Sequence, residues 1–142
     1  MQCSGGQTYE GEWHEGKRHG KGVLSYNQDK TILYTGSWEL GLRSGYGQMK
    51  YASGNVYEGH WKADRKCGRG AMSWKSVDEF YVGDWCDDKP NGFGEHIWAD
   101  NGSRSMTKQM CNMYRGEWRN GVRNGQGTFF YSNGSQYSGK LS

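Results

Sequence analysis

The chain has 142 residues, of which 24 are glycine and one is proline, and its formal net charge is +3 at pH 7. Hydrophobic residues make up only 33%, yet aromatic residues reach 15%, which argues against a disordered chain and suits a thin sheet rather than a thick two-layer core. The small charge gives no indication of a nucleic-acid partner, and no apolar run approaches the roughly 20 residues that span a bilayer.

One pattern recurs along the chain: Tyr-x-Gly-x-Trp, followed seven residues after the Trp by Gly-x-Gly. Residues 1–8 read as the tail of a preceding repeat, copies start at positions 9, 34, 57, 81 and 114, and a sixth, truncated copy starts at 137. A fixed period of this kind predicts one repeat array over residues 1–142. The repeat residues are Tyr9, Gly11, Trp13, Gly20, Gly22, Tyr34, Gly36, Trp38, Gly45, Gly47, Tyr57, Gly59, Trp61, Gly68, Gly70, Tyr81, Gly83, Trp85, Gly92, Gly94, Tyr114, Gly116, Trp118, Gly125 and Gly127.

Each copy is predicted to be a β-hairpin whose turn lies two and three residues after the Trp, where Asn120-Gly121 is a strong hairpin signal. Counting outward from the turn gives three cross-strand pairs: Trp13 with Arg18, Gly11 with Gly20 and Tyr9 with Gly22. All six residues of these pairs are predicted to lie on one aromatic and glycine-rich face of the hairpin, with a polar face opposite. Each repeat tryptophan is expected to pack on its own or the next repeat. Stacking the hairpins predicts a single twisted antiparallel sheet with almost no helix.

Two connections exceed the period. Residues 27–33 predict a longer link between the first two copies. Residues 99–113 carry about ten residues beyond the period, include Met106, Met110, Cys111 and Met113, and predict a protruding loop or an extended hairpin.

These motifs resemble the MORN repeat family, and the resemblance covers nearly the whole chain because five copies keep one register. It implies an all-β fold, an elongated single-layer twisted antiparallel sheet of stacked hairpins. Within the family, residues 9–74 are most similar to a component of the radial spoke head of cilia and flagella. This second resemblance is less specific, because repeats of this kind resemble one another wherever they occur.

No motif indicates an enzyme, a cofactor or a metal. The stretch from His14 to His19 has one residue too many for the zinc-protease pattern and lies on a hairpin rather than a helix. The Gly-x-Gly pairs lack the helix that a phosphate-binding loop requires. His60 and His96 stand alone, without a partner for catalysis. The four cysteines form no C-x-x-C pair, and without a secretory signal pattern we expect reduced thiols inside the cell.

A candidate basic ridge follows the turns. Its members, four or five residues after each Trp, are Lys17, Arg18, Arg43, Arg65, Lys66, Lys89 and Arg123. The ridge could attract anionic lipid headgroups. The favoured interpretation is that four of these cations cover the Trp opposite them in their own hairpin, with Pro90 taking that place beside Trp85.

The sequence therefore predicts a non-enzymatic scaffold that binds other proteins. The radial spoke resemblance implies axonemal partners and a place in the cilium or flagellum. Self-association through the terminal strands is also expected. Two alternatives stay open: a module that tethers the chain to membranes through phosphoinositides, which is less favoured, and a targeting segment of a larger enzyme.

Overall fold

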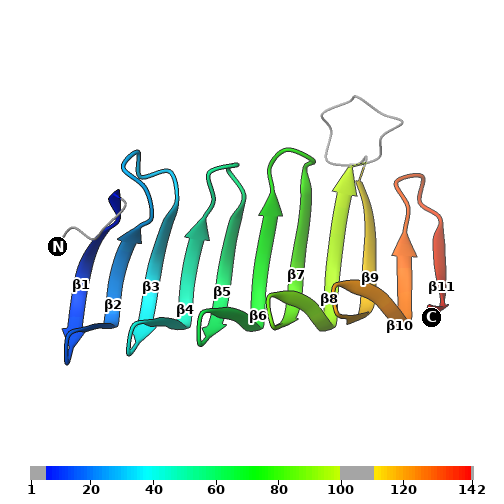
Figure 1. Ribbon diagram of the computed structural model, residues 1–142. Helices are drawn as coiled ribbons and strands as arrows, with labels where there is room; N and C mark the ends of the chain where they lie inside the picture. The colour runs from blue at the N-terminus through cyan, green and yellow to red at the C-terminus, as the bar shows by residue number, and fades with distance from the viewer. Residues whose placement is uncertain (1–5, 100–110, 142) are drawn as a thin grey trace.

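The computed structural model describes residues 6–99 and 111–141. Eleven strands form one antiparallel sheet in which each strand pairs with its neighbours in sequence (Figure 1). The strands are β1 Thr8–His14, β2 Lys17–Ser25, β3 Leu33–Glu39, β4 Leu42–Lys50, β5 Val56–Lys62, β6 Arg65–Trp74, β7 Glu79–Cys86, β8 Lys89–Ala99, β9 Cys111–Arg119, β10 Val122–Phe130 and β11 Gln136–Leu141. The predicted all-β, single-layer sheet of stacked hairpins is confirmed.

The hairpin turns lie where the sequence predicts them. Glu15 and Gly16 have φ angles of 50° and 78°, and Asn120 and Gly121 have 50° and 84°. Two successive residues with positive φ define the turn that matches the right-handed twist of paired strands. The remaining three hairpins share this geometry, at Leu40-Gly41, Ala63-Asp64 and Asp87-Asp88.

The register along each hairpin differs from the predicted one. The observed pairs of the first hairpin are Trp13 with Arg18, Gly11 with Gly22 and Tyr9 with Leu24. The same offset recurs in the hairpins that hold Trp38, Trp61, Trp85 and Trp118. The first predicted pair is therefore confirmed, and the pairing of Gly11 with Gly20 and of Tyr9 with Gly22 is wrong.

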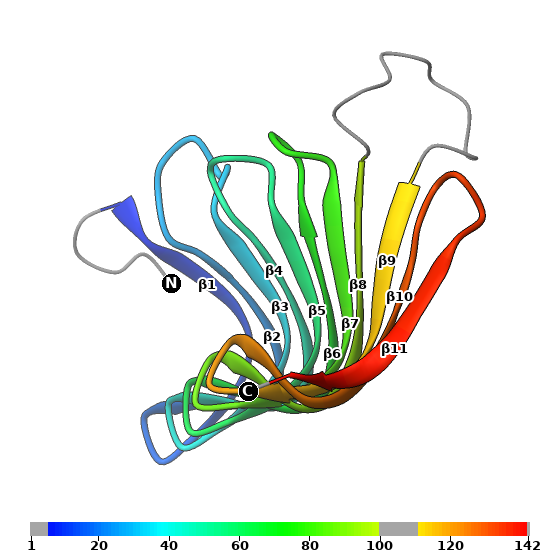
Figure 2. The same cartoon turned by 90° about the vertical axis from the view of Figure 1, so that its right-hand side faces the viewer.

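A bulge at Gly20 causes this offset. Gly20 has a φ of 69°, and the carboxylate of Glu12 accepts a hydrogen bond from the backbone N–H of Lys21. A Cβ on Gly20 would strike the Glu12 side chain, so this glycine faces the polar side and not the aromatic side, where the sequence placed it. Because bulges bend strands, the sheet curves into an open trough, which Figure 2 shows end on.

Beyond the bulge, one row of glycines crosses the whole sheet. It comprises Gly11, Gly22, Gly36, Gly47, Gly59, Gly70, Gly83, Gly94, Gly116, Gly127 and Gly139. A Cβ on Gly22 would overlap the ring of Tyr9, so the tyrosine lies directly across the glycine backbone. The row thus supplies the space that large rings need in a sheet of one layer.

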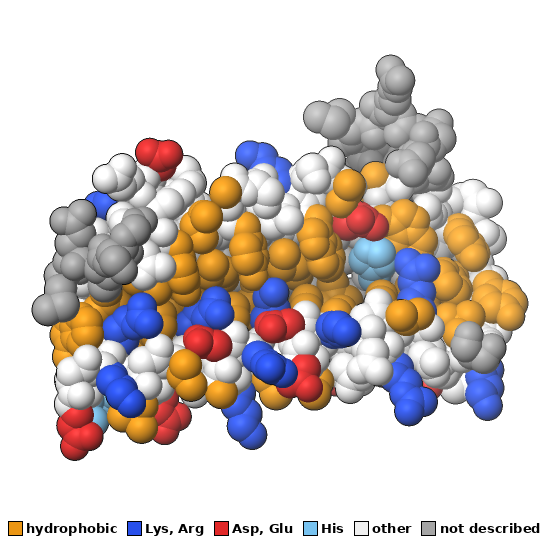
Figure 3. Space-filling model, in the orientation of Figure 1, with side chains coloured by type: hydrophobic (Ala, Val, Ile, Leu, Met, Phe, Trp, Pro, Cys, Tyr) orange, Lys and Arg blue, Asp and Glu red, His pale blue; other side chains and the backbone are white. Residues whose placement is uncertain are grey.

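The core lies on one face only, on the inner side of the trough. Its buried members are Tyr9, Leu24, Tyr34, Trp38, Met49, Tyr57, Trp61, Met72, Tyr81, Trp85, Tyr114 and Trp118. Figure 3, which looks into the trough, shows an apolar band running from end to end with a row of basic side chains below it. A second set of aromatic side chains is only partly buried and packs against this core; it includes Tyr26, Tyr51, Trp74 and Trp98.

The two long connections are described in part. Strand β2 ends at Ser25 and β3 begins at Leu33, which leaves the predicted longer link between them. Of the insertion predicted over 99–113, Ala99 pairs with Cys111 as the end of an extended hairpin, while Met106 and Met110 lie outside the described residues. Cys67, Cys86 and Cys111 are free thiols, and Cys3 lies outside the described residues.

Candidate functional site

Each interior tryptophan lies between two tyrosines of adjacent repeats. The indole of Trp61 meets the ring of Tyr57 in its own repeat at 5.2 Å between centroids and that of Tyr34 in the preceding repeat at 5.4 Å, both edge to face. Its Nε1–H donates a hydrogen bond of 3.2 Å to the carbonyl of Gly47. The other tryptophans that make this set of contacts are Trp38, Trp85 and Trp118.

The sequence predicted one of the two repeats that each interior tryptophan contacts, but not the other. Contact with its own repeat is observed, but the expected contact with the next repeat is wrong, because the second partner belongs to the preceding one. Trp61 pairs with Gly45 on β4, and its Nε1–H reaches the carbonyl of Gly47 on the same strand, so the indole lies against the preceding repeat. The Tyr–Trp–Tyr stack therefore joins each repeat to the one before it.

The tyrosine hydroxyls are engaged in the same stack. The hydroxyl of Tyr57 donates to the carbonyl of His60 at 2.9 Å, and that of Tyr34 donates to the carbonyl of Ser37 at 2.9 Å. Burial raises the pKa of Tyr34, Tyr57 and Tyr81 well above the ordinary tyrosine value. A phenolate at these positions would lose its donated hydrogen bond and sit among apolar rings.

Alkaline pH should therefore unfold the chain cooperatively. Because the folded-state pKa of these tyrosines is raised above the unfolded value of 10.0, their contribution to stability is complete below pH 10 and is lost as the pH rises above it. We expect tyrosinate absorbance at about 295 nm to rise together with loss of the β-sheet circular dichroism signal. Ionisation of all ten tyrosines near pH 10, with the sheet signal unchanged, would contradict the burial of these hydroxyls.

Four cations of the basic ridge turn inward onto the rings. Lys66 and Arg123 lie within about 6 Å of the Trp of their own hairpin, as predicted, but Arg18 and Arg43 reach a different partner. The guanidinium of Arg43 lies 4.5 Å from the ring centroid of Trp61, and that of Arg18 lies 4.7 Å from Trp38. Each thus covers the tryptophan of the next repeat, whereas the sequence placed it over the Trp of its own hairpin. The backbone pair is as predicted, but the long side chain points across to the following strand pair.

The Arg43 guanidinium is also held by the turn of the next repeat. Its Nε donates to the Asp64 carboxylate at 3.0 Å, and its Nη2 donates to the Asp64 carbonyl at 3.0 Å. The Nη2 of Arg18 donates to the carbonyl of Gly41, the equivalent turn residue, at 3.4 Å. Lys66 is shared more widely, with its Nζ 5.6 Å from Trp85 and 6.0 Å from Trp61.

The remaining members of the basic ridge point into solvent. Lys17 and Lys89 are exposed, and Arg65 is exposed while its Nη1 lies 3.3 Å from the Asp87 carboxylate. The ridge therefore consists of two sets, one that packs on the aromatic stack and one that is solvated. Acidic residues such as Glu15 and Asp87 stand among the solvated set.

The two sets should respond differently to loss of charge. Arg43→Gln should lower the free energy of unfolding by about 1–2 kcal/mol, because a half-buried cation loses a ring face and an ion pair together. The matched variant Arg65→Gln removes an exposed ion pair and should change stability by less than about 0.5 kcal/mol. Urea unfolding of both variants measures the difference. Equal effects would show that Arg43 does not pack on the stack.

Arg123 occupies a different setting from the other inward cations. Its guanidinium lies 4.7 Å from the ring of Trp98, and its Nη2 donates to Nδ1 of His96 at 3.0 Å. The Nε atom of Arg123 is buried and has no hydrogen-bond partner among the described residues. Burial also lowers the pKa of the Arg123 guanidinium below its ordinary value. His96 in turn lies 3.2 Å from the carboxylate of Glu79.

His96 is neutral in this chain of contacts. Burial, and then the charge of Arg123, lower the pKa of His96 below its ordinary value. Because Arg123 can only donate, Nδ1 of His96 accepts, and Nε2–H donates to Glu79. The sequence interpretation left His96 as an isolated residue. The signal for its role was that His96 takes the position held by Leu24, Met49, Met72 and Phe129 in the other copies.

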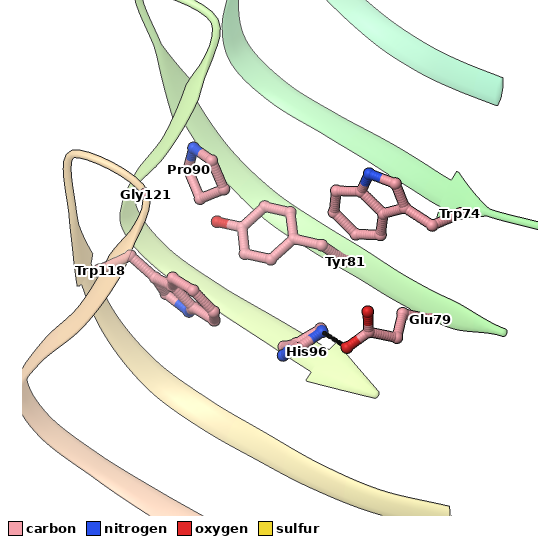
Figure 4. Close-up of a pocket in the computed structure, with 7 residues that line it drawn as sticks. All are labelled: Trp74, Glu79, Tyr81, Pro90, His96, Trp118 and Gly121. Atoms are coloured by element: carbon pink, nitrogen blue, oxygen red, sulfur yellow. Dashed lines mark ion pairs between the residues drawn. The ribbon is translucent and has the colours of Figure 1, made fainter. Parts of the chain in front are cut away.

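A cavity of about 280 Å³ opens beside His96 (Figure 4). It is lined by the rings of Trp74, Tyr81 and Trp118, by the Glu79 carboxylate, and by Pro90 and Gly121 at the turn end. The carboxylate and the aromatic rings are groups that attract cations, and the guanidinium of Arg123 lies 5.8 Å from the Trp118 ring centroid.

Metal ligands do not gather in the described part of the chain. Within residues 6–99 and 111–141, no group of three or more His, Cys, Asp or Glu side chains is placed to hold a metal ion. His14 and His19, which the sequence set aside as turn residues, have ring centroids 5.2 Å apart on the first hairpin. The same described ranges contain no helix with the length and apolar character to cross a bilayer.

Comparison with known proteins agrees with this geometry. The sequence profile of the MORN repeat matches residues 9–29, 34–56, 57–76, 81–103 and 114–136, more than half of the chain. MORN repeat-containing protein 3 of Xenopus laevis is 35% identical over 66% of this chain and 32% of that protein. Alsin of Rattus norvegicus and alsin of Homo sapiens are each 33% identical over 93% of this chain and 8% of alsin.

The fold and these matches define a repeat protein built from stacked β-hairpins with an aromatic stack between neighbours. The chain belongs to the MORN repeat family. It spans about a third of the length of the Xenopus relative and less than a tenth of alsin.

Proposed function

We propose that this chain is a non-enzymatic scaffold that binds other proteins along its trough and at its sheet edges. The observation that supports the proposal most is the apolar band, which runs along one side of an open sheet. Within the described residues, β1 and β11 each pair on one side only. An open edge can add a strand from another chain, and the neighbouring rings add apolar contact.

For the cellular setting, we propose an intracellular place in the radial spoke head of a cilium or flagellum, with axonemal proteins as partners. The support is the resemblance of residues 9–74 to radial spoke components. Crosslinking of intact axonemes, followed by mass spectrometry, tests it. Crosslinks to radial spoke proteins are expected, and absence of the chain from the axonemal fraction would refute the setting.

A second candidate is an interaction segment of a much longer protein. The alignment with alsin favours it, because nearly all of this chain aligns with only 8% of alsin. The full-length reading frame decides this question directly. Further domains encoded on either side are the expected result for this candidate.

Edge-mediated assembly gives a prediction for the chain alone. We expect reversible self-association through β11 that changes less than about threefold between low and high salt, since strand addition does not depend on surface charge. Tyr137→Lys on β11 should raise the dissociation constant about tenfold or more, because a lysine blunts an exposed edge. Sedimentation equilibrium over a range of salt concentrations measures both quantities.

The matched control is Tyr46→Lys on the interior strand β4, since Tyr46 is 50% exposed and Tyr137 is 54% exposed. This control should leave the association unchanged. A strictly monomeric chain, or equal effects of the two variants, would contradict assembly through β11.

Binding to membranes is the alternative function, and a vesicle-pelleting assay on the same purified protein tests it. The cations free to meet a headgroup are Lys17, Arg65 and Lys89, and acidic residues stand among them. We therefore expect no salt-sensitive pelleting with phosphatidylcholine vesicles that contain phosphatidylinositol 4,5-bisphosphate. Pelleting that disappears when these three residues become glutamine, with the fold retained, would establish the membrane role instead.

A further inference from the structure

The chain fills the space above most of its inter-repeat tryptophans with a cation of its own. Arg18 lies over Trp38, Arg43 lies over Trp61, and Lys66 lies beside Trp85. In the two arginine cases the guanidinium also donates to the carbonyl of the next turn, that of Gly41 or Asp64. We call this arrangement the cation slot: a tryptophan face, a tyrosine ring and a turn carbonyl around one guanidinium.

The slot above Trp118 has the same frame but no cation from the preceding repeat. Pro90 pairs with Trp85 as Arg18 pairs with Trp13. The N–H of Gly121 donates to the carbonyl of Pro90 at 2.8 Å, and the N–H of Gly41 donates to the carbonyl of Arg18 at 2.8 Å. The backbones therefore correspond, and only the long side chain is missing.

The cavity of about 280 Å³ occupies the place of that side chain. Figure 4 shows the Tyr81 and Trp118 rings beside Pro90, with Trp74, His96 and Glu79 on the other side of the opening. Gly121, the counterpart of Gly41, also lines the cavity, so its turn brings a carbonyl of the kind that accepts from Arg18. The guanidinium of Arg123 binds His96 and Trp98 and lies 5.8 Å from the ring centroid of Trp118, so the cation near this slot comes from the repeat of Trp118 itself.

Glu79 distinguishes this slot from the filled ones. The residues at its position, two before each repeat tyrosine, are Gln7, Ile32, Asn55 and Asn112 in the other copies. At this position, a carboxylate therefore stands only beside the slot that lacks a cation from the preceding repeat. Its contact with neutral His96 holds it at the rim, where its charge favours a cation and opposes an anion.

We propose that the slot above Trp118 binds an arginine side chain supplied by a partner protein. A planar guanidinium can stack on the indole face, donate to the Gly121 carbonyl and reach the Glu79 carboxylate, as Arg43 does on Trp61 and Asp64. A quaternary ammonium from a lipid headgroup could contact the rings but has no N–H to donate to the carbonyl. This inference deepens the proposed scaffold function. It rests on that function in one respect, namely that the partner is a protein.

The test uses N-acetyl-arginine methylamide as the probe and the indole N–H signal of Trp118 as the readout in ¹⁵N-labelled protein, assigned with Trp118→Phe. We expect a saturable shift of this signal. The citrulline analogue, which has the same shape and no charge, should bind at least about tenfold more weakly. Choline is the comparator for a lipid headgroup and should also bind more weakly than the arginine probe.

Two variants locate the site. Pro90→Arg places a guanidinium beside the Gly121 turn as Arg18 lies beside the Gly41 turn, so it should fill the slot from within and abolish the shift while the other indole signals stay in place. Glu79→Gln keeps the rings and a hydrogen-bond acceptor for His96, and it should weaken probe binding severalfold. If the Pro90→Arg chain does not fold, the Glu79→Gln series and the citrulline comparison still decide.

Equal binding of arginine and citrulline, or an unchanged shift in a folded Pro90→Arg chain, would overturn the proposal. Tighter binding of choline than of arginine would replace it with a headgroup site. The experiment needs neither partner nor self-association. If the chain is monomeric in sedimentation but the arginine probe binds, edge-mediated assembly is refuted and the arginine slot stands. If the chain self-associates but the probe does not bind, the slot is refuted and edge-mediated assembly stands.

Discussion

Trp61→Ala is expected to lower the free energy of unfolding by roughly 3–5 kcal/mol, the range for removal of a buried large aromatic side chain. The indole of Trp61 is 4% exposed and joins two repeats. Its loss removes contacts with Tyr57 and Tyr34 and the ring under Arg43. Urea unfolding followed by circular dichroism measures the change.

Trp13→Ala is the matched control at the end of the array. Trp13 is 43% exposed, and within residues 6–99 and 111–141 its one aromatic partner is Tyr9, at 5.0 Å. The expected loss is about 1 kcal/mol, because an end repeat has only one neighbour and the ring stays partly hydrated. Similar losses for Trp13 and Trp61 would show that the inter-repeat stack is not the source of stability.

Gly59→Ala should be at least as damaging, although it adds a single methyl group. A Cβ on Gly59 would overlap the Cα of Gly70 and lie 2.6 Å from the Arg69 carbonyl oxygen. Backbone atoms in two paired strands cannot move aside as a flexible side chain can, so the strands must separate. We expect a cost of about 3 kcal/mol or more, above the usual range for an overpacked site.

Gly16→Ala is the matched glycine control. No atom lies within 4 Å of a Cβ built on Gly16, and its φ is 78°. The substitution therefore carries only the strain of the left-handed conformation, about 1–2 kcal/mol. Thermal unfolding of both variants compares the two effects. A Gly59→Ala chain as stable as Gly16→Ala would contradict the close approach of β5 and β6.

The sequence was sufficient to predict the hairpins and their turns, because turn chemistry is local. It was not sufficient for the register, because counting outward from the turn assumes an uninterrupted ladder. Gly20 carries the bulge, and the sequence shows only that a glycine is present there. Two glycines separated by one residue have different roles: Gly20 allows a positive φ, and Gly22 makes room for the ring of Tyr9.

The candidate site was predicted in its composition but not in its contacts. The positions of the inward cations follow from the repeat, yet which tryptophan each one covers depends on the direction of a long side chain after a bulge. Pro90 pairs with Trp85 as predicted, but the prediction did not include its second consequence, that the slot above Trp118 has no cation from the preceding repeat. The sequence did contain a signal for this slot, because Pro90, His96 and Glu79 replace the usual residues in the same copy of the repeat.

The most direct test of the central claim, that each interior tryptophan joins its repeat to the preceding one, is a set of nuclear Overhauser contacts from the Trp61 indole. We expect contacts to the ring protons of Tyr57 and Tyr34 and to the side chain of Arg43. Contacts from Trp61 to Tyr81 of the following repeat, with none to Tyr34, would contradict the claim.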